Sequence, residues 1–108
     1  MAELGGKGTT ASVEGSVGPG GVPVIAVGGE IDISNVESVR AIIDGLLDGH
    51  SGHAVFTVDA LTFMDSSGIA LFVQIHNRLG SIELRDPTDI VRRVIDITGL
   101  TDTFGVIP

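Results

Sequence analysis

The spacing of the hydrophobic residues changes several times along the chain, and each change marks a predicted element. Two short β-prone runs, 13–17 and 22–27, flank a turn rich in Gly and Pro, which predicts an antiparallel pair of strands. The apolar residues that follow recur at helical spacing and predict a helix near 35–48. We expect Ser34 and Glu37 to form a capping box at its start and a glycine to stand just past its end.

The second half of the chain alternates predicted strands with predicted helices. The continuous apolar run 54–58 is typical of a strand in the middle of a sheet. Residues 63–68 are predicted to form a loop that leads into a second helix, which Gly80 ends. Apolar and polar residues alternate at 82–85 and predict a strand with one solvent-exposed face. Residues 104–107 are predicted to form the last strand.

A third helix is predicted to begin at Asp86 and Pro87, because an N-cap oxygen followed by proline at the first helical position is a common helix start. Gly99 is predicted to cap its other end, with Leu100 placed for a Schellman contact. The apolar stripe of this helix is predicted to consist of Ile90, Val91, Val94 and Ile97.

This order of elements predicts one α/β domain. Strands and helices that alternate imply right-handed crossovers and a mixed, largely parallel sheet, with an N-terminal antiparallel strand and about three packed helices. Glycine is concentrated near the N-terminus, so we expect residues 1–11 to be a flexible tail and residues 12–108 to be the folded domain.

Composition narrows the function classes. The 108 residues include 6 Lys plus Arg against 14 Asp plus Glu, which gives a net charge of −8 and disfavours direct binding to nucleic acid or to an anionic membrane surface. The chain has no Cys, which excludes disulfides, a thiolate nucleophile and a Cys-based metal centre. Neither a secretory signal nor a membrane-spanning run is recognisable, so we expect a cytoplasmic protein.

Three histidines raise the question of a metal site, and His50 and His53 are spaced three residues apart. They lie in a Gly-rich predicted loop without a third ligand nearby, and His76 falls in the middle of a predicted helix, so we expect no metal. The N-terminal glycines lack the ending of a phosphate loop, and we expect no nucleotide cofactor.

The segment Asp65-Ser66-Ser67-Gly68 is the clearest candidate for chemistry. A serine on a strand-to-helix turn could act as a nucleophile, but no histidine base follows the predicted helix, so a hydrolase is not expected. Asp, Ser and Gly before an apolar helix are also what an ordinary N-cap needs, and from the residues alone this interpretation is favoured.

A resemblance to a known family changes that balance. Five blocks occur in the family's order: Gly29–Asp32, Ala54–Asp59, Leu61–Ile69, Pro87 with Val91–Val94, and Thr98–Leu100. Together they resemble a STAS domain and, more narrowly, the bacterial anti-sigma-factor antagonists. The Asp-Ser-Ser-Gly motif after Phe63 and Met64 is the most specific of these blocks.

The resemblance implies a switched binding protein and not an enzyme, without cofactors. The first Ser of the motif, Ser66, would be phosphorylated by the partner anti-sigma factor, which is also a serine kinase, and dephosphorylated by a PP2C-type phosphatase. The unmodified protein would bind the anti-sigma factor and release the sigma factor, which regulates transcription. The expected partner-binding residues are Asp32, Asp65, Ser66, Ser67 and Gly68.

Two departures from the family leave other interpretations open. The stretch between Gly68 and Pro87 is shorter than usual by about six residues, which predicts a shortened second helix or loop. The C-terminal helix that many relatives carry does not follow Pro108, and the oligomeric state stays open. The alternative function is a STAS scaffold or signalling subunit of a larger stress-sensing assembly, without direct control of a sigma factor.

Overall fold

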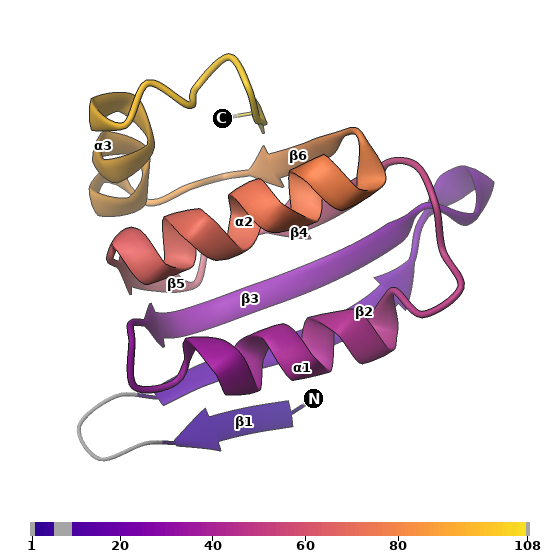
Figure 1. The fold of residues 1–108 in the computed structure, drawn as a ribbon, viewed down its shortest axis with the longest axis horizontal. Helices are drawn as coiled ribbons and strands as arrows, with labels where there is room; N and C mark the ends of the chain where they lie inside the picture. The colour runs from indigo at the N-terminus through magenta and orange to yellow at the C-terminus, as the bar shows by residue number, and fades with distance from the viewer. Residues whose placement is uncertain (1, 6–9, 108) are drawn as a thin grey trace.

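The structure, a computed structural model, describes residues 2–5 and 10–107. Within them a single sheet has seven strands in the order β1-β2-β3-β4-β6-β7, and β5 pairs with the C-terminal part of β3 (Figure 1). The strands are β1 (Ala2–Gly5), β2 (Thr10–Val17), β3 (Pro23–Ile31), β4 (Ala54–Thr57), β5 (Leu61–Met64), β6 (Ile82–Arg85) and β7 (Gly105–Ile107). The β1–β2 and β2–β3 pairs are antiparallel and the others are parallel, which confirms the predicted mixed α/β fold.

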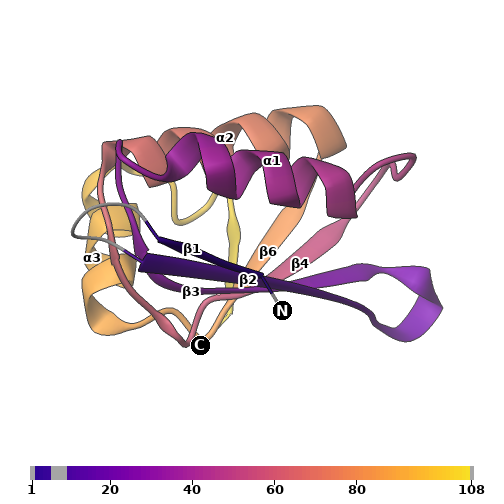
Figure 2. The ribbon, with the colours of Figure 1, turned by 90° about the horizontal axis from the view of Figure 1, so that it is seen from below.

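The helices of the described residues are α1 (Val36–Leu46), α2 (Ser66–Leu79) and α3 (Asp89–Ile97). Figure 2 shows α1 and α2 side by side on one face of the sheet. The third helix contacts β5, at the end of the sheet where α2 begins. None of these helices, over the part of the chain that the structure describes, has the length and hydropathy needed to span a bilayer.

The hydrophobic core lies between the sheet and the helices. Phe56 of β4 meets Phe72 of α2 edge to face, with ring centroids 5.4 Å apart, and Phe72 in turn contacts Phe104 before β7. Such edge-to-face pairs combine a large buried apolar area with a favourable ring geometry. They fix α2 over the centre of the sheet, where β4 lies between β3 and β6 as predicted for a middle strand.

The glycine that ends α2 is confirmed, whereas α1 ends earlier than predicted. Gly80 follows α2 directly with φ +90°, a left-handed conformation that glycine adopts without a steric penalty. Helix α1 ends at Leu46 with Leu47 as its C-cap, so Gly49, with φ +76°, lies two residues beyond the cap and not just past the end of the helix. After α3, the Leu100 N–H donates to the Ile95 carbonyl and the Gly99 N–H donates to the Asp96 carbonyl. These two bonds are the predicted Schellman motif.

Two predicted helix starts are wrong. Helix α1 begins at Val36 with Asn35 as the N-cap residue, and the Ser34 N–H donates to the Asp32 carboxylate, so there is no Ser34–Glu37 capping box. The N-cap of α3 is Thr88 and not Asp86. In both cases a hydrogen bond to a neighbouring turn or strand moves the start; the Thr88 hydroxyl, for example, donates to the Leu61 carbonyl of β5.

The apolar stripe of α3 and the loop before α2 also differ from prediction. Val91 and Ile95 are the buried residues of α3, whereas Ile90 is 56% exposed and Ile97 is 77% exposed. Residues 61–64 form the strand β5, although the sequence predicts a loop over 63–68. β3 continues past the end of its pairing with β4, and this leaves an edge on which a further strand can form.

The N-terminal segment contains a strand that was not predicted. β1 pairs with β2 in the register Ala2 to Val13, and β2 starts at Thr10. Within the predicted tail, 1–11, residues 1 and 6–9 lie outside the described residues. The flexibility of the tail and the boundary at residue 12 stay predictions.

Candidate functional site

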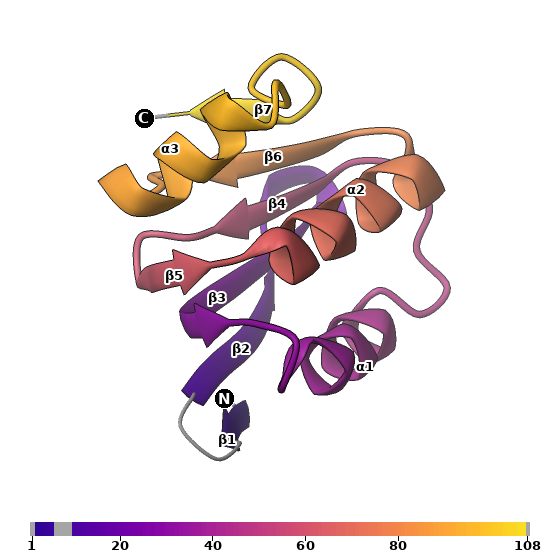
Figure 3. The ribbon, with the colours of Figure 1, turned by 60° about the vertical axis from the view of Figure 1, so that its left-hand side comes forward.

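The pairing of β3 with β5 brings two loops to the same end of the sheet. Ile31 is the last residue of β3 and stands opposite Met64, the last residue of β5. One residue further on, the Asp65 N–H donates to the Ile31 carbonyl, with N and O 3.2 Å apart. The turn that begins at Asp32 and the start of α2 therefore lie beside one another at this end, as the ends of β3 and β5 in Figure 3 show.

Asp65 is the N-cap of α2 and directs Ser66 outward. One oxygen of its carboxylate accepts from the Ser67 N–H at 2.8 Å, and its carbonyl accepts from the N–H groups of Gly68 and Ile69. The side-chain cap satisfies an N–H that the first turn of a helix leaves without a partner. Ser66 is exposed, and the hydrogen bonds among the described residues leave its hydroxyl unengaged.

Gly68 is a buried residue in the first turn of α2. A Cβ at this position would lie 2.5 Å from Met64 Cγ and 2.9 Å from Met64 Sδ. The missing side chain lets the first turn of α2 pack directly on β5, and so helps to place Ser66. The expected contact between Gly68 and a partner stays a prediction.

Asp32 organises a turn of four residues between β3 and α1. Its carboxylate accepts from the Ser34 N–H at 2.8 Å, and its own N–H donates to the Asn35 side-chain oxygen at 3.1 Å. Asn35 is 3% exposed and its side-chain nitrogen donates to the Glu30 carbonyl at 2.8 Å. Asn35 was not among the predicted site residues, although Asp and Asn three positions apart after a strand are typical of such turns.

Of the predicted site residues, Asp65, Ser66, Ser67 and Gly68 thus form the start of α2, and Asp32 lies on the neighbouring turn. Their exposure differs: Ser66 is exposed, Asp32, Asp65 and Ser67 are partly buried, and Gly68 is buried. Two carboxylates beside an exposed hydroxyl make an acidic surface at the positive end of the α2 dipole. This arrangement can present the hydroxyl to another protein.

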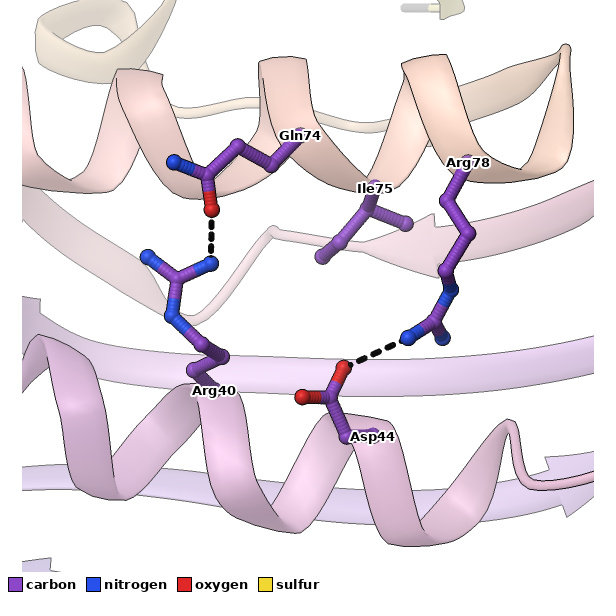
Figure 4. Close-up of a pocket in the computed structure, with 5 residues that line it drawn as sticks. All are labelled: Arg40, Asp44, Gln74, Ile75 and Arg78. Carbon is purple, nitrogen blue, oxygen red and sulfur yellow. Dashed lines mark hydrogen bonds and ion pairs between the residues drawn. The ribbon is translucent and has the colours of Figure 1, made fainter.

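A second feature is the groove between α1 and α2, with a volume of about 160 Å³ (Figure 4). Arg78 donates to the Asp44 carboxylate at 2.9 Å, and Arg40 donates to the side-chain oxygen of Gln74. Ile75 lies at the bottom of the groove. Both arginines are therefore used to link the two helices to each other.

The histidines of the loop between α1 and β4 have structural partners. His50 Nε2 lies 2.9 Å from the carbonyl oxygen of His53, and His53 Nδ1 lies 2.8 Å from the Ser81 hydroxyl. Among residues 2–5 and 10–107 the structure places no group of three or more His, Cys, Asp or Glu side chains that could hold a metal ion.

Comparison with known proteins places this arrangement in a family. Residues 16–108 match the family model of the STAS domain. The chain belongs to the STAS domain family. The match covers β3, β5 and the start of α2, so the STAS domain includes every predicted site residue.

Two curated relatives of this STAS domain are both named as anti-sigma factor antagonists. The anti-sigma F factor antagonist of Lysinibacillus sphaericus is 32% identical over 82 residues, which are 71% of this chain and 70% of that protein. The anti-sigma-B factor antagonist of Staphylococcus aureus is 26% identical over 86 residues, which are 76% of this chain and 80% of that protein.

Two solved structures are similar to this STAS domain. The anti-sigma factor antagonist SpoIIAA in its unphosphorylated form matches with a TM-score of 0.73 and 27% identity, over 88% of this chain and 87% of that one. An anti-sigma factor antagonist from Mycobacterium paratuberculosis matches with a TM-score of 0.82 and 25% identity, over 91% and 86%. The overall fold described above is thus similar to that of these two antagonists.

Proposed function

We propose that this STAS domain is an anti-sigma-factor antagonist, a cytoplasmic regulator of transcription that is not itself an enzyme. In its unmodified form it binds an anti-sigma factor that is also a serine kinase, and the sigma factor is released. The observation that carries the proposal is the exposed hydroxyl of Ser66 at the start of α2, within the motif that resembles that of the antagonists. The names of the relatives from Lysinibacillus sphaericus and Staphylococcus aureus support it.

Phosphorylation of Ser66 switches the binding off. The kinase binds ATP as the phosphoryl donor. A bond forms between Ser66 Oγ and the γ-phosphorus of ATP, and the bond between that phosphorus and the β-phosphate oxygen breaks to release ADP. The hydroxyl proton is transferred to a base on the kinase. A PP2C-type phosphatase reverses the change by hydrolysing the phosphoserine with water. The solved structure of the relative SpoIIAA is of its unphosphorylated form, which supports the proposal.

The new charge falls on a surface that is already acidic. A phosphoryl group adds about −1.5 to −2 charges at pH 7, which takes the net charge from −8 to about −10. Asp65 already holds the Ser67 N–H, so the phosphoryl group stays on the solvent side of the helix start. The fold therefore survives, while a bound partner has to desolvate the added charge. A penalty of about 3–4 kcal/mol would weaken binding a few hundred-fold.

The test uses purified anti-sigma factor kinases encoded in the same genome, mixed with this protein and ATP. We expect one phosphate per chain, located at Ser66 by mass spectrometry, and none on the variant Ser66→Ala. Ser51→Ala is the matched control, because Ser51 is an exposed hydroxyl in the loop between α1 and β4, outside the expected partner-binding residues. This variant should accept phosphate as the parent does.

A binding measurement completes the test. Ser66→Asp should keep the circular dichroism spectrum and melting temperature of the parent. It should bind the anti-sigma factor at least a hundred-fold more weakly than the unphosphorylated parent does. Phosphate at Thr62 or Thr88 would show that the site is wrong. Equal affinity of Ser66→Asp and the parent would show that charge is not the switch.

A further inference from the structure

Ile33 is an apolar side chain in an unusual place. It is 78% exposed, in the turn between β3 and α1. Turn positions are mostly occupied by Gly, Pro, Asn, Asp and Ser, because these residues satisfy or adapt to the turn backbone. An isoleucine there contributes nothing to the core and leaves a large apolar surface in water.

The turn that carries Ile33 is held on both sides. Asp32, the residue before Ile33, bonds to residues after it: its carboxylate accepts from the Ser34 N–H, and its N–H donates to the Asn35 side-chain oxygen. On the other side of Ile33, the buried Asn35 side chain donates to the Glu30 carbonyl. The backbone N–H groups of Asn35 and Val36 donate to the Asp32 carbonyl. The backbone of Ile33 is therefore ordered before any partner arrives, which lowers the entropy that binding would cost.

Ile33 lies within the area that a partner bound at Ser66 would cover. The two residues follow neighbouring strands, and the Ile31 carbonyl and Asp65 N–H that precede them are hydrogen-bonded. An interface of standard size buries about 800 Å² on each partner, a patch about 30 Å across. A protein that contacts the start of α2 therefore also reaches the turn.

Resting on the proposed function, we propose that Ile33 is an anchor for the anti-sigma factor and inserts into an apolar pocket on that protein. Lys or Arg side chains at the rim of the pocket would face Asp32 and Asp65, because Asp32 directly precedes the anchor, Asp65 lies at the end of the neighbouring strand, and the whole chain is acidic. A buried apolar residue inside a polar rim is the usual composition of an interface hot spot. Ile33 thus supplies affinity, and Ser66 supplies the switch.

The test compares variants in binding to the anti-sigma factor that phosphorylates the parent protein. Ile33→Ser should raise the dissociation constant at least ten-fold, mainly through faster dissociation, as measured by surface plasmon resonance. Ile33→Leu keeps an apolar side chain of the same size and should stay within about three-fold of the parent. Both variants should melt like the parent, since Ile33 has little contact with the core.

Val17→Ser is the matched control. Val17 is also 78% exposed, but it pairs with Pro23 at the start of β3, the opposite end of that strand from Ile31. The control removes a similar apolar surface from a distant part of the molecule and should bind as the parent does. It separates loss of a contact from a general effect of making the surface more polar.

The outcomes separate the two proposals. If the parent is phosphorylated and bound but Ile33→Ser binds equally well, the anchor is wrong and the proposed function stands. If Val17→Ser weakens binding as much as Ile33→Ser, the anchor is likewise wrong. If no anti-sigma factor binds or phosphorylates the parent, the proposed function fails and the anchor fails with it.

Discussion

Single glycines show how differently one residue type can act in two helices. Gly68 lies in the first turn of α2 against Met64, whereas Gly45 lies near the end of α1, where a Cβ would have no neighbouring atom within 4 Å. Glycine costs helix stability at both positions, because the flexible backbone has more freedom to lose. Only at Gly68 does a packed neighbour explain why the cost is kept.

We predict that alanine has opposite effects at these two positions. In Gly68→Ala the new Cβ would overlap Met64, and an overpacking cost of about 2 kcal/mol outweighs the gain in helix propensity of about 1 kcal/mol. The free energy of unfolding should fall by about 1 kcal/mol. In Gly45→Ala only the propensity gain remains, and stability should rise by about 0.5 kcal/mol. Urea unfolding measures both, and stabilisation by Gly68→Ala would contradict the packing argument.

A related effect at the residue scale concerns Ser66. Because Asp65 and Gly68 fix the first turn of α2 from two sides, the position of the hydroxyl depends on residues that need not touch a partner. A motif of four residues therefore combines structural and functional demands. The sequence pattern alone favoured the helix cap; in the structure the same residues form the cap and leave one hydroxyl exposed.

At the scale of elements, the two long helices are held to the sheet by apolar contacts and to each other by polar ones. Ile75 of α2 is 3% exposed, whereas the ion pair between Arg78 and Asp44 is about half exposed on both sides. Exposed ion pairs contribute little, because water and salt screen them and two long side chains must be ordered. The exposed ion pair across the groove in Figure 4 therefore contributes little to stability, whereas the buried Ile75 beneath it contributes much more.

We predict a clear difference between two substitutions in this groove. Ile75→Ala should lower the free energy of unfolding by about 3 kcal/mol, the usual cost of truncating a buried isoleucine. Arg78→Gln should lower it by less than about 1 kcal/mol, and the effect should shrink in 1 M NaCl. Chemical denaturation with and without salt provides the measurement. A loss in Arg78→Gln that equals the loss in Ile75→Ala would show that the polar link dominates.

Helix interiors were predictable at this scale, but two of the helix starts were not. Hydrophobic spacing depends on neighbours three or four residues apart, which the sequence contains. The start of α3 depends on the bond from the Thr88 hydroxyl to the Leu61 carbonyl, 27 residues away. The exposure of Ile90 has the same origin, because the contact with β5 selects which side of α3 is buried.

For the whole molecule, the order of the strands in the sheet determines which strands unfold locally most easily. β4 lies between β3 and β6, while β7 at one edge of the described sheet has a single neighbour and three residues. Amides in a central strand exchange with solvent only when much of the fold opens, whereas edge amides exchange through local opening. The core packing of Phe56 under Phe72 reinforces this difference.

We predict that hydrogen exchange follows this order. The Phe56 amide of β4 should be protected at least a hundred-fold more than the Val106 amide of β7. Exchange measured by NMR at neutral pH gives both rates from one sample. Equal protection of the two amides would contradict the central position of β4.

The amino-acid sequence by itself determined the order of the three helices and of the strands other than β1 and β5, the middle position of β4, and the glycines that end α2 and α3, because these depend on hydrophobic spacing and local backbone conformation. Its blocks also pointed to the STAS family and to Ser66. Only the tertiary structure decided that β5 is a strand, since that strand exists through its pairing with β3. The tertiary structure also placed the Asp32 turn beside the start of α2, because this follows from the pairing of β3 with β5 and from the bond between the Asp65 N–H and the Ile31 carbonyl, which join residues far apart in the sequence. It likewise showed that Ile33 is exposed to water.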